Sequence, residues 1–209
     1  MSSSRPPFTT PDGLLSVYFP KDGDPSAFND AEIAEIARLL QLCGHAYLKG
    51  VDHPNLFDIG DRLGSGGYGQ VDKILSKISY KEYAMKRILR HAEFRKTKVV
   101  IKEFLKEKTI LQSLDHRHIV RYVGSFTDAA HFGIVMSPIA DCDLASYFNQ
   151  ACFDTAKHPT VQKFFGCLAN ALYYLHSKNI RHRDIKPGNI LIHQGNVLIK
   201  DFGLSRGHP

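Results

Sequence analysis

The alternation of apolar and polar positions along the chain predicts strands first and helices later. Strands are predicted at residues 57–63, 70–75, 83–88, 119–126, 132–136, 190–192 and 197–199. Helices are predicted at 96–113 and 161–177, where apolar residues recur at helical spacing. On the second of these helices the predicted apolar face consists of Phe165, Leu168, Leu172 and Leu175. This order of elements favours an α+β fold with two lobes, a β-rich lobe followed by a helical one.

The segment before the first of these strands has a different composition. Residues 1–28 carry half of the ten prolines together with scattered Ser, Gly and Asp, which predicts a disordered tail. Asn29, followed by Glu32, is typical of a helix cap, and apolar residues then recur up to Gly44. We therefore expect an N-terminal helical extension over 29–56. The apolar face of its helix, 29–44, packs either on the following domain or on a partner.

Composition and charge narrow the class of protein. The chain has 209 residues, of which 43% are apolar and 23% charged, as in globular proteins. No apolar run approaches the roughly 18–20 residues of a membrane helix, and the first residues lack the apolar core of a secretory signal. The four cysteines form no CxxC pair, which favours reduced thiols and an intracellular protein of the cytoplasm or nucleus. The net charge of +6 is concentrated between Lys86 and Lys108, where a solvated helix face is favoured over nucleic-acid binding.

A glycine-rich turn lies between the first two predicted strands. Residues 64–71 fit the pattern GxGxxGxV, which on its own also suits an ordinary hairpin turn. A dinucleotide fold requires a helix directly after the glycines, whereas Val71 here opens a strand. Because glycine lacks a Cβ, its backbone N–H groups approach an anion closely. The pattern therefore indicates a flap over phosphate groups.

Lys86 is the second candidate. Strand alternation places it on the same face as Ala84, and a lysine on an inward face is costly unless it is paired. A solvent-exposed edge lysine is the alternative. The following helix supplies two acidic partners, Glu103 and Glu107. Glu107 is favoured because an apolar stripe lies beside it, formed by Ile110, Leu111 and Leu114.

The most specific motifs lie near the C-terminal end. Residues 182–191 read HRDIKPGNIL, and residues 201–205 read DFGLS, with 17 residues from Asp184 to Asp201. Two acids and the Asn189 amide at this separation suit a metal-assisted transfer. One carboxylate orients a hydroxyl nucleophile, and the other binds magnesium, which prefers hard oxygen ligands.

With these motifs in this order, residues 57–209 resemble the eukaryotic protein kinase family, serine/threonine class. The resemblance implies a protein-kinase-like two-lobe fold, with a β-rich N-lobe (57–136) that includes one regulatory helix, a hinge (137–140) and a partial helical C-lobe (141–209). It implies transfer of the γ-phosphate of ATP, with Mg²⁺, to Ser or Thr hydroxyls of protein substrates. By resemblance, the catalytic residues are Asp184, Lys186, Lys86 and Glu107, and the metal ligands are Asn189 and Asp201. The ATP-binding residues implied are Leu63, Gly64, Gly66, Gly67, Gly69, Val71, Ala84, Lys86, Met136, Ser137, Ile139, Asp143 and Leu191.

Individual roles follow from the same resemblance. Asp184 takes the position of the catalytic base, and Lys186 that of the residue contacting the transferred phosphate, which is similar to the serine/threonine class. Arg183 before Asp184 suggests control by phosphorylation of an activation loop. Pro138 lies at the one hinge position where a missing N–H donor is harmless.

Two departures from the family pattern keep an alternative open. The chain stops at Pro209, six residues beyond Gly203, so the helical lobe is expected to be incomplete and the chain a poor catalyst. Lys200 precedes Asp201, where it either competes with magnesium or extends outward. The alternative is therefore a catalytically weak kinase-like module that binds nucleotide or a partner.

Overall fold

Two units make up the chain in the computed structural model, which describes residues 46–47, 57–66, 69–77, 80–90, 94–128, 130–151 and 158–207. The first unit consists of residues up to 105 together with 123–135, and the second of 106–122 together with 136–209. The predicted tail 1–28 and the predicted helix 29–44 lie outside the described residues.

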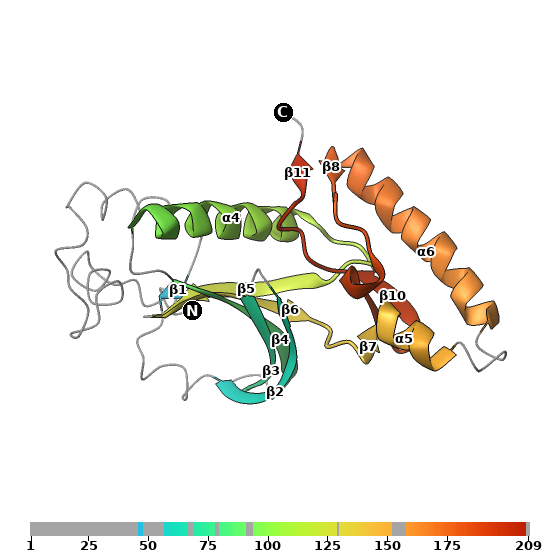
Figure 1. Ribbon diagram of the computed structural model, residues 1–209, viewed down its shortest axis with the longest axis horizontal. Coiled ribbons are helices and arrows are strands. Elements are labelled where there is room, and N and C mark those ends of the chain that lie inside the picture. The colour runs from blue at the N-terminus through green and yellow to red at the C-terminus, as the bar shows by residue number, and fades with distance from the viewer. Residues whose placement is uncertain are drawn as a thin grey trace, which may run out of the picture. The chain divides into compact units, whose positions relative to one another are not determined.

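The first unit is built on a six-stranded sheet (Figure 1). Its strands are β1 (Ala46–Tyr47), β2 (Phe57–Gly66), β3 (Gly69–Ser76), β4 (Glu82–Leu89), β5 (Arg121–Thr127) and β6 (His131–Ser137). Their order in the sheet is β1-β5-β6-β4-β3-β2, with β5 and β6 running on into the second unit at one end. β2, β3 and β4 form an antiparallel meander, whereas β1 pairs in parallel with β5.

Alternation along β3 explains which face of this sheet is covered. Asp72, Ile74 and Ser76 are buried, and the residues between them are more exposed. The core on this face contains Ile74, Met85, Phe126 and Val135, with Phe57 and Tyr83 packed against it. Each large apolar side chain buried in this way stabilises the fold by about 1.5–3 kcal/mol.

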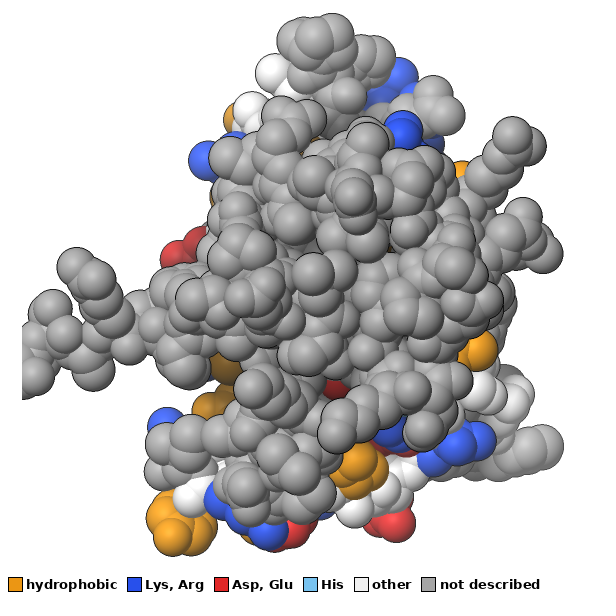
Figure 2. Space-filling view, turned by 90° about the vertical axis from the view of Figure 1, so that its left-hand side faces the viewer, with side chains coloured by type: hydrophobic (Ala, Val, Ile, Leu, Met, Phe, Trp, Pro, Cys, Tyr) orange, Lys and Arg blue, Asp and Glu red, His pale blue; other side chains and the backbone are white. Residues whose placement is uncertain are grey.

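Helix α4 (Phe94–Ser113) lies along the sheet of the first unit with its N-terminal half (Figure 1). Phe104 anchors it there, with its ring centroid 5.3 Å from that of Phe132 in β6. Lys102 and Glu103 are exposed, as expected of a solvated charged face, whereas Lys108 is fully buried. On the face seen in Figure 2, described Lys and Arg side chains lie at several places around the edge of the view, and some are beside acidic or apolar side chains.

The second unit combines helices with short strands. After the C-terminal part of α4, its elements are β7 (Cys142–Asp143), α5 (Leu144–Ala151), α6 (His158–Ser177), β8 (Ile180–Arg181), the 3-10 turn η3 (Pro187–Asn189), β9 (Ile190–His193), β10 (Asn196–Ile199) and β11 (Arg206–Gly207). Two small sheets result, β10-β9-β7 and β11-β8. The core contains Leu144, Phe164, Ile190, Ile192 and Val197. This core fixes the β9–β10 hairpin, and the hairpin positions the loops on either side of it.

The predicted α+β class is confirmed, and so are the predicted strands and the helices predicted at 96–113 and 161–177, with ends that differ by a few residues. One detail was wrong: Phe165 was assigned to the apolar face of α6, but its side chain is 70% exposed. Phe164 is buried in its place and packs edge-on against Tyr147. The buried stripe thus begins one residue earlier, because α5 covers that side of α6.

Cys142 and Cys167 are half-buried thiols, while Cys43 and Cys152 lie outside the described residues. Among the described helices, none combines the length and the apolar character needed to cross a membrane.

Candidate active site

Two loops of the second unit, residues 182–189 and 200–205, are held together by hydrogen bonds that connect distant parts of the sequence. The ring of His182 bonds through Nε2 to the carbonyl oxygen of Lys200 at 2.9 Å. The Lys200 N–H donates to the carbonyl oxygen of Asn189 at 3.0 Å. Ser205 Oγ donates to the carbonyl oxygen of His182 at 3.1 Å. The HRD and DFG motifs therefore lie side by side.

His182 is buried, and its partners fix its tautomer. A carbonyl oxygen only accepts, so Nε2 carries the proton, while Nδ1 accepts from the backbone N–H of Asp184 at 3.3 Å. Burial lowers the pKa of His182, and this outweighs the opposing bond to Lys200. Its ring also meets Phe202 edge-on, with centroids 4.9 Å apart. His182 is thus a neutral connector between the loops.

Asp184 presents a carboxylate that is fixed by two donors. Its Oδ2 accepts from Lys186 Nζ at 2.8 Å and from Asn189 Nδ2 at 2.7 Å. The hydrogen bond from Lys186 is the main cause that lowers the pKa of Asp184, and the Asn189 bond adds to it. The carboxylate is therefore ionised at neutral pH and held in one orientation while it remains partly accessible to solvent.

Asn189 and Asp201 are the predicted metal ligands, and their chemistry fits Mg²⁺. Asn189 is buried and uses Nδ2 as the donor in two bonds to Asp184, one to the backbone oxygen and one to the carboxylate. The oxygen end of the amide is consequently the atom left for a hard cation. Asp201 supplies a carboxylate from the adjacent loop, so both ligand types that Mg²⁺ prefers are present.

The backbone at this site is held in an uncommon conformation. Arg183 has φ of 70° and Asp201 has φ of 67°, both in the left-handed region that residues other than glycine rarely adopt. Each such residue costs about 1–3 kcal/mol and persists only where the surroundings over-determine it. Two of the five described non-glycine residues with positive φ thus lie at this site, one directly before the first acidic candidate and one at the second.

Glu107 approaches the DFG motif from α4. Its side chain is only 3% exposed, whereas Glu103 is exposed, which agrees with the choice between the two made from the apolar stripe. A Cβ placed on Gly203 would lie 3.7 Å from Glu107 Oε2 and 3.5 Å from Asp201 Oδ1. The two carboxylates thus converge on Gly203, and Lys106 Nζ reaches the carbonyl oxygen of Gly203 at 3.4 Å.

In the first unit, the glycine-rich segment forms the predicted hairpin. Gly64 pairs with Val71 and Gly66 with Gly69 across β2 and β3, while Gly67 lies outside the described residues. Gly69 has φ of 123°, and a Cβ there would overlap the carbonyl oxygen of Arg87. Glycine is therefore required at position 69 on both counts.

Lys86 lies on the predicted face of β4. Its cross-strand partner is Val71, while Ala84 pairs with Lys73, so Val71, Ala84 and Lys86 share one face of the sheet. The Lys86 side chain is 6% exposed, which excludes the alternative of a solvent-exposed edge lysine. The predicted pairing of Lys86 with Glu107 stays a prediction.

The other predicted ATP-binding residues lie at strand ends and in the segment after β6. Leu63 is exposed, Met136 is buried, and Ser137, Ile139 and Leu191 are half-buried. Asp143 accepts a hydrogen bond from the N–H of Ser146 at 2.7 Å, so one of its oxygens caps α5. The alternative acid, Asp141, accepts from the N–H of Gln194 at 2.7 Å.

Sequence reasoning gave no role to His182 or to Ser205, which join the two loops. It also missed a buried ion pair between Asp72 and Arg87 in the first unit. Of these features, the Asp72–Arg87 pair was the one that the sequence could have indicated, because Asp72 is an acidic residue at a position of β3 that alternation assigns to the covered face.

Comparisons with known proteins place these motifs in context. A family model described as a protein kinase domain matches residues 57–208. The chain is 33% identical over 154 residues to a cAMP-dependent protein kinase catalytic subunit of Arthrobotrys oligospora, covering 73% of this chain and 29% of that protein. It is 32% identical over 158 residues to an Aurora kinase of Schizosaccharomyces pombe, covering 75% and 43%. It is 33% identical over 150 residues to mitogen-activated protein kinase kinase kinase A of Dictyostelium discoideum, covering 70% and 16%. The chain thus spans less than half the length of these curated relatives.

Proposed function

The chain belongs to the protein kinase family, and we propose that it transfers the γ-phosphate of ATP to serine and threonine hydroxyls of protein substrates. The observation that carries this proposal is the Asp184 carboxylate, which is ionised, partly accessible and held by Lys186 and Asn189. These two partners lower the pKa of the Asp184 carboxyl group.

Asp184 would orient the acceptor hydroxyl and take its proton. In the transfer, the hydroxyl oxygen forms a bond to the γ-phosphorus, the bond from that phosphorus to the ADP oxygen breaks, and the proton passes to Asp184. A carboxylate with a lowered pKa is a weak base, so its main contribution is to hold the hydroxyl in line. The proton leaves once the new bond has made the hydroxyl acidic. Positioning of this kind suits phosphoryl transfer, whose transition state is loose.

Lys186 would serve two groups. Its ammonium lies 2.8 Å from Asp184 and is 57% exposed, so it is accessible to a phosphate oxygen. In that position the Lys186 ammonium would stabilise the negative charge of the phosphate group while that group moves toward the acceptor hydroxyl. A lysine here also favours serine and threonine over tyrosine as acceptors, as the family resemblance implies.

Magnesium would be held by Asn189 Oδ1 and the Asp201 carboxylate, and when bound it neutralises charge on the phosphates. The chain's own part is to fix these two ligands. Asn189 is fixed through its bonds to Asp184, and Asp201 through the hydrogen bonds of its neighbours Lys200 and Phe202 with the rest of the site.

ATP would be bound in addition by the glycine hairpin and by Lys86, whose burial on the face shared with Val71 and Ala84 supports a role in binding an anion. The further ATP-binding residues named from the resemblance are part of this proposal. The use of ATP fits an intracellular protein. The apolar face of the helix predicted at 29–44 is proposed as the place where a partner binds.

The proposal is tested with the whole chain, radiolabelled ATP, Mg²⁺ and a mixture of generic protein substrates, followed by phosphoamino-acid analysis. Label on phosphoserine and phosphothreonine that disappears in Asp201→Asn is expected. Asp58→Asn is the matched control, because Asp58 is an exposed acid that forms an ion pair with Lys77 in the first unit. Label confined to phosphotyrosine would contradict the acceptor class, and absence of transfer by the unchanged chain would contradict the activity.

A further inference from the structure

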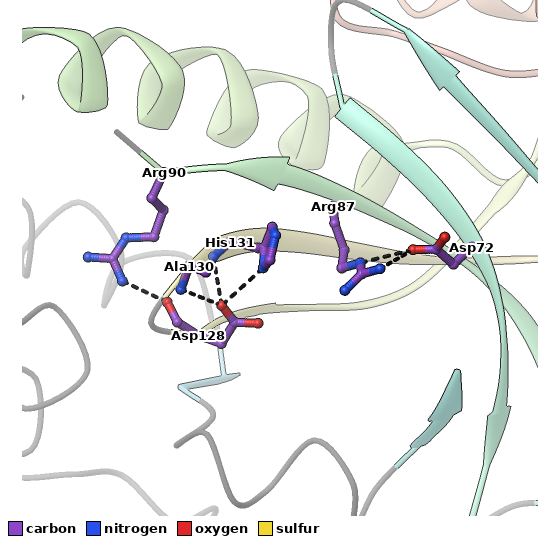
Figure 3. A network of polar contacts seen from close by, with 6 residues as sticks. All are labelled: Asp72, Arg87, Arg90, Asp128, Ala130 and His131. Carbon is purple, nitrogen blue, oxygen red and sulfur yellow. Dashed lines mark hydrogen bonds and ion pairs between the residues drawn. The ribbon is translucent and has the colours of Figure 1, made fainter. Parts of the chain in front are cut away.

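A buried carboxylate in the first unit gathers polar groups from three strands. Asp72 of β3 is 2% exposed, and its Oδ2 accepts from Arg87 of β4 through Nε at 2.9 Å and Nη2 at 2.5 Å (Figure 3). Its Oδ1 accepts from Gln70 Nε2 at 2.6 Å, and Arg62 Nε of β2 lies 3.9 Å away. The planar fork of arginine fits this two-bond arrangement, which a lysine cannot reproduce.

The pair lies at the point of the sheet where the proposed ATP-binding groups are anchored. Arg87 directly follows Lys86, and the register pairs Gln70 with Arg87 and Val71 with Lys86. The Arg87 carbonyl oxygen also faces Gly69 so closely that a Cβ there would overlap it. Arg87 therefore joins the glycine hairpin to the strand of Lys86 through its backbone and through its side chain.

A second arginine directly follows the C-terminal end of the same strand. Arg90 donates through Nη1 to the carbonyl oxygen of Asp128 at 2.6 Å and through its backbone N–H to Ala130 at 2.8 Å (Figure 3). The Asp128 carboxylate in turn accepts from the N–H groups of Ala130 and His131, which fixes the turn before β6. Arg90 thus fixes the connection that follows β4, three residues beyond Arg87.

An ion pair with a buried carboxylate and a partly buried arginine contributes less to net stability than to the choice of a single geometry. Apolar side chains of similar size fill such a site at equal or lower free energy, because the two charges need not be desolvated. The ion pair favours one register of β3 against β4. A slip of one residue between these strands would move Asp72 away from Arg87 and leave the charge of Asp72 unpaired.

We propose that Asp72 and Arg87 are a positioning pair that fixes the glycine hairpin and Lys86 in the geometry required to bind the phosphates of ATP. The inference rests on the proposed function, because its effect is on ATP. Neither residue touches the nucleotide in this account, since both lie on the face of the sheet opposite to Lys86. They act through the backbone of residues 69 and 86.

A purely structural role makes a different prediction for an apolar replacement of the pair. Asp72→Leu combined with Arg87→Met removes both charges and keeps most of the volume, so stability close to that of the unchanged chain is expected. If the pair only fills space, transfer is also restored in this double variant. If the pair positions Lys86, stability returns but the use of ATP does not.

The experiment measures kcat/KM for ATP, KM for the protein substrate and the thermal midpoint in Asp72→Asn, in Asp72→Leu/Arg87→Met, and in a matched control. The control is Lys73→Met/Glu82→Gln, which removes an exposed pair of 2.7 Å between the same two strands. We expect kcat/KM for ATP to fall about tenfold or more in both Asp72 variants, as for a small misplacement of a positioning group. KM for the protein substrate stays within about twofold, and the control is unchanged.

Recovery of both stability and kcat/KM for ATP in the apolar double variant would overturn the inference, as would values within about twofold of the unchanged chain in both Asp72 variants. Either result would leave the proposed function intact, because the unchanged chain would still transfer phosphate. Absence of transfer by the unchanged chain would overturn the proposed function and this inference together.

Discussion

Asn189→Ala removes the side chain that holds Asp184, and its cost follows from the bonds lost. The Asn189 amide donates to the backbone oxygen of Asp184 at 2.9 Å and to its carboxylate at 2.7 Å. A neutral hydrogen bond contributes about 1 kcal/mol and one to a charged group about 1.5–3 kcal/mol. The Asp184 carboxylate is partly exposed and regains water, which offsets part of the second loss. We expect a loss of about 2 kcal/mol in the free energy of unfolding.

This loss leaves the chain folded, because domain stabilities are about 5–15 kcal/mol. It is measured by urea denaturation, as a lower midpoint at an unchanged slope. The matched control is Asn196→Ala, which removes one exposed hydrogen bond of 3.2 Å from the β9–β10 hairpin. The same change should raise the pKa of Asp184, because Asn189 contributes to lowering it, and ¹³C resonances of the carboxyl group report this directly. Equal losses in the two variants, with an unshifted Asp184 pKa, would refute the reasoning.

Three further predictions follow from the same contacts. Lys86→Met should abolish phosphate transfer while thermal unfolding stays cooperative, since it removes the charge and keeps the volume; transfer within a few-fold of the unchanged chain would reject the role. Gly69→Ala should lower the free energy of unfolding by at least about 1 kcal/mol, because φ is positive and a Cβ meets backbone, whereas Gly124→Ala meets nothing; denaturation midpoints compare them. Burial lowers the pKa of His182 and His118, so the unfolded state binds more protons below its His pKa of about 6.5. Stability should therefore be full above that pH and decline as the pH falls from there toward the lower folded pKa values; a flat pH profile between 7 and 5 would contradict this.

Local patterns were sufficient for much of the fold and for the motif residues. The strands around Val71 and Lys86 alternate with period two, and α4 has a continuous apolar stripe, so each element is defined by its own residues. Glu107, which the apolar stripe favoured over Glu103 as the partner of Lys86, is buried and Glu103 is exposed, while the pairing itself stays a prediction.

Elements that exist because of tertiary contacts could not be predicted from local sequence patterns. β8 and β11 have two residues each and exist only because they pair with one another, so neither carries a periodic signal. The burial of Phe164 rather than Phe165 depends on where α5 lies, which the α6 sequence does not contain.

The same distinction applies to the site. The role of His182 depends on bonds to residues 18 positions or more away in the sequence, and the Asp72–Arg87 pair spans 15 positions. Both contacts can be predicted only when it is known which residues of two paired segments lie opposite one another. Motif residues such as Asp184 and Asn189 were proposed from the motif itself, because they lie within one short loop, where the structure places a hydrogen bond across five positions.

The central claim is that Asp184 orients the acceptor and takes its proton, and it is tested most directly by a single-turnover measurement on Asp184→Asn. The substitution keeps the size and removes the charge, so ATP affinity should change little, whereas the transfer rate should fall by about 10²–10⁴-fold, the range for loss of a general base. ATP dissociation constants from titration and rates from rapid quench separate the two effects. A transfer rate within a few-fold of the unchanged chain, at equal ATP occupancy, would contradict the account.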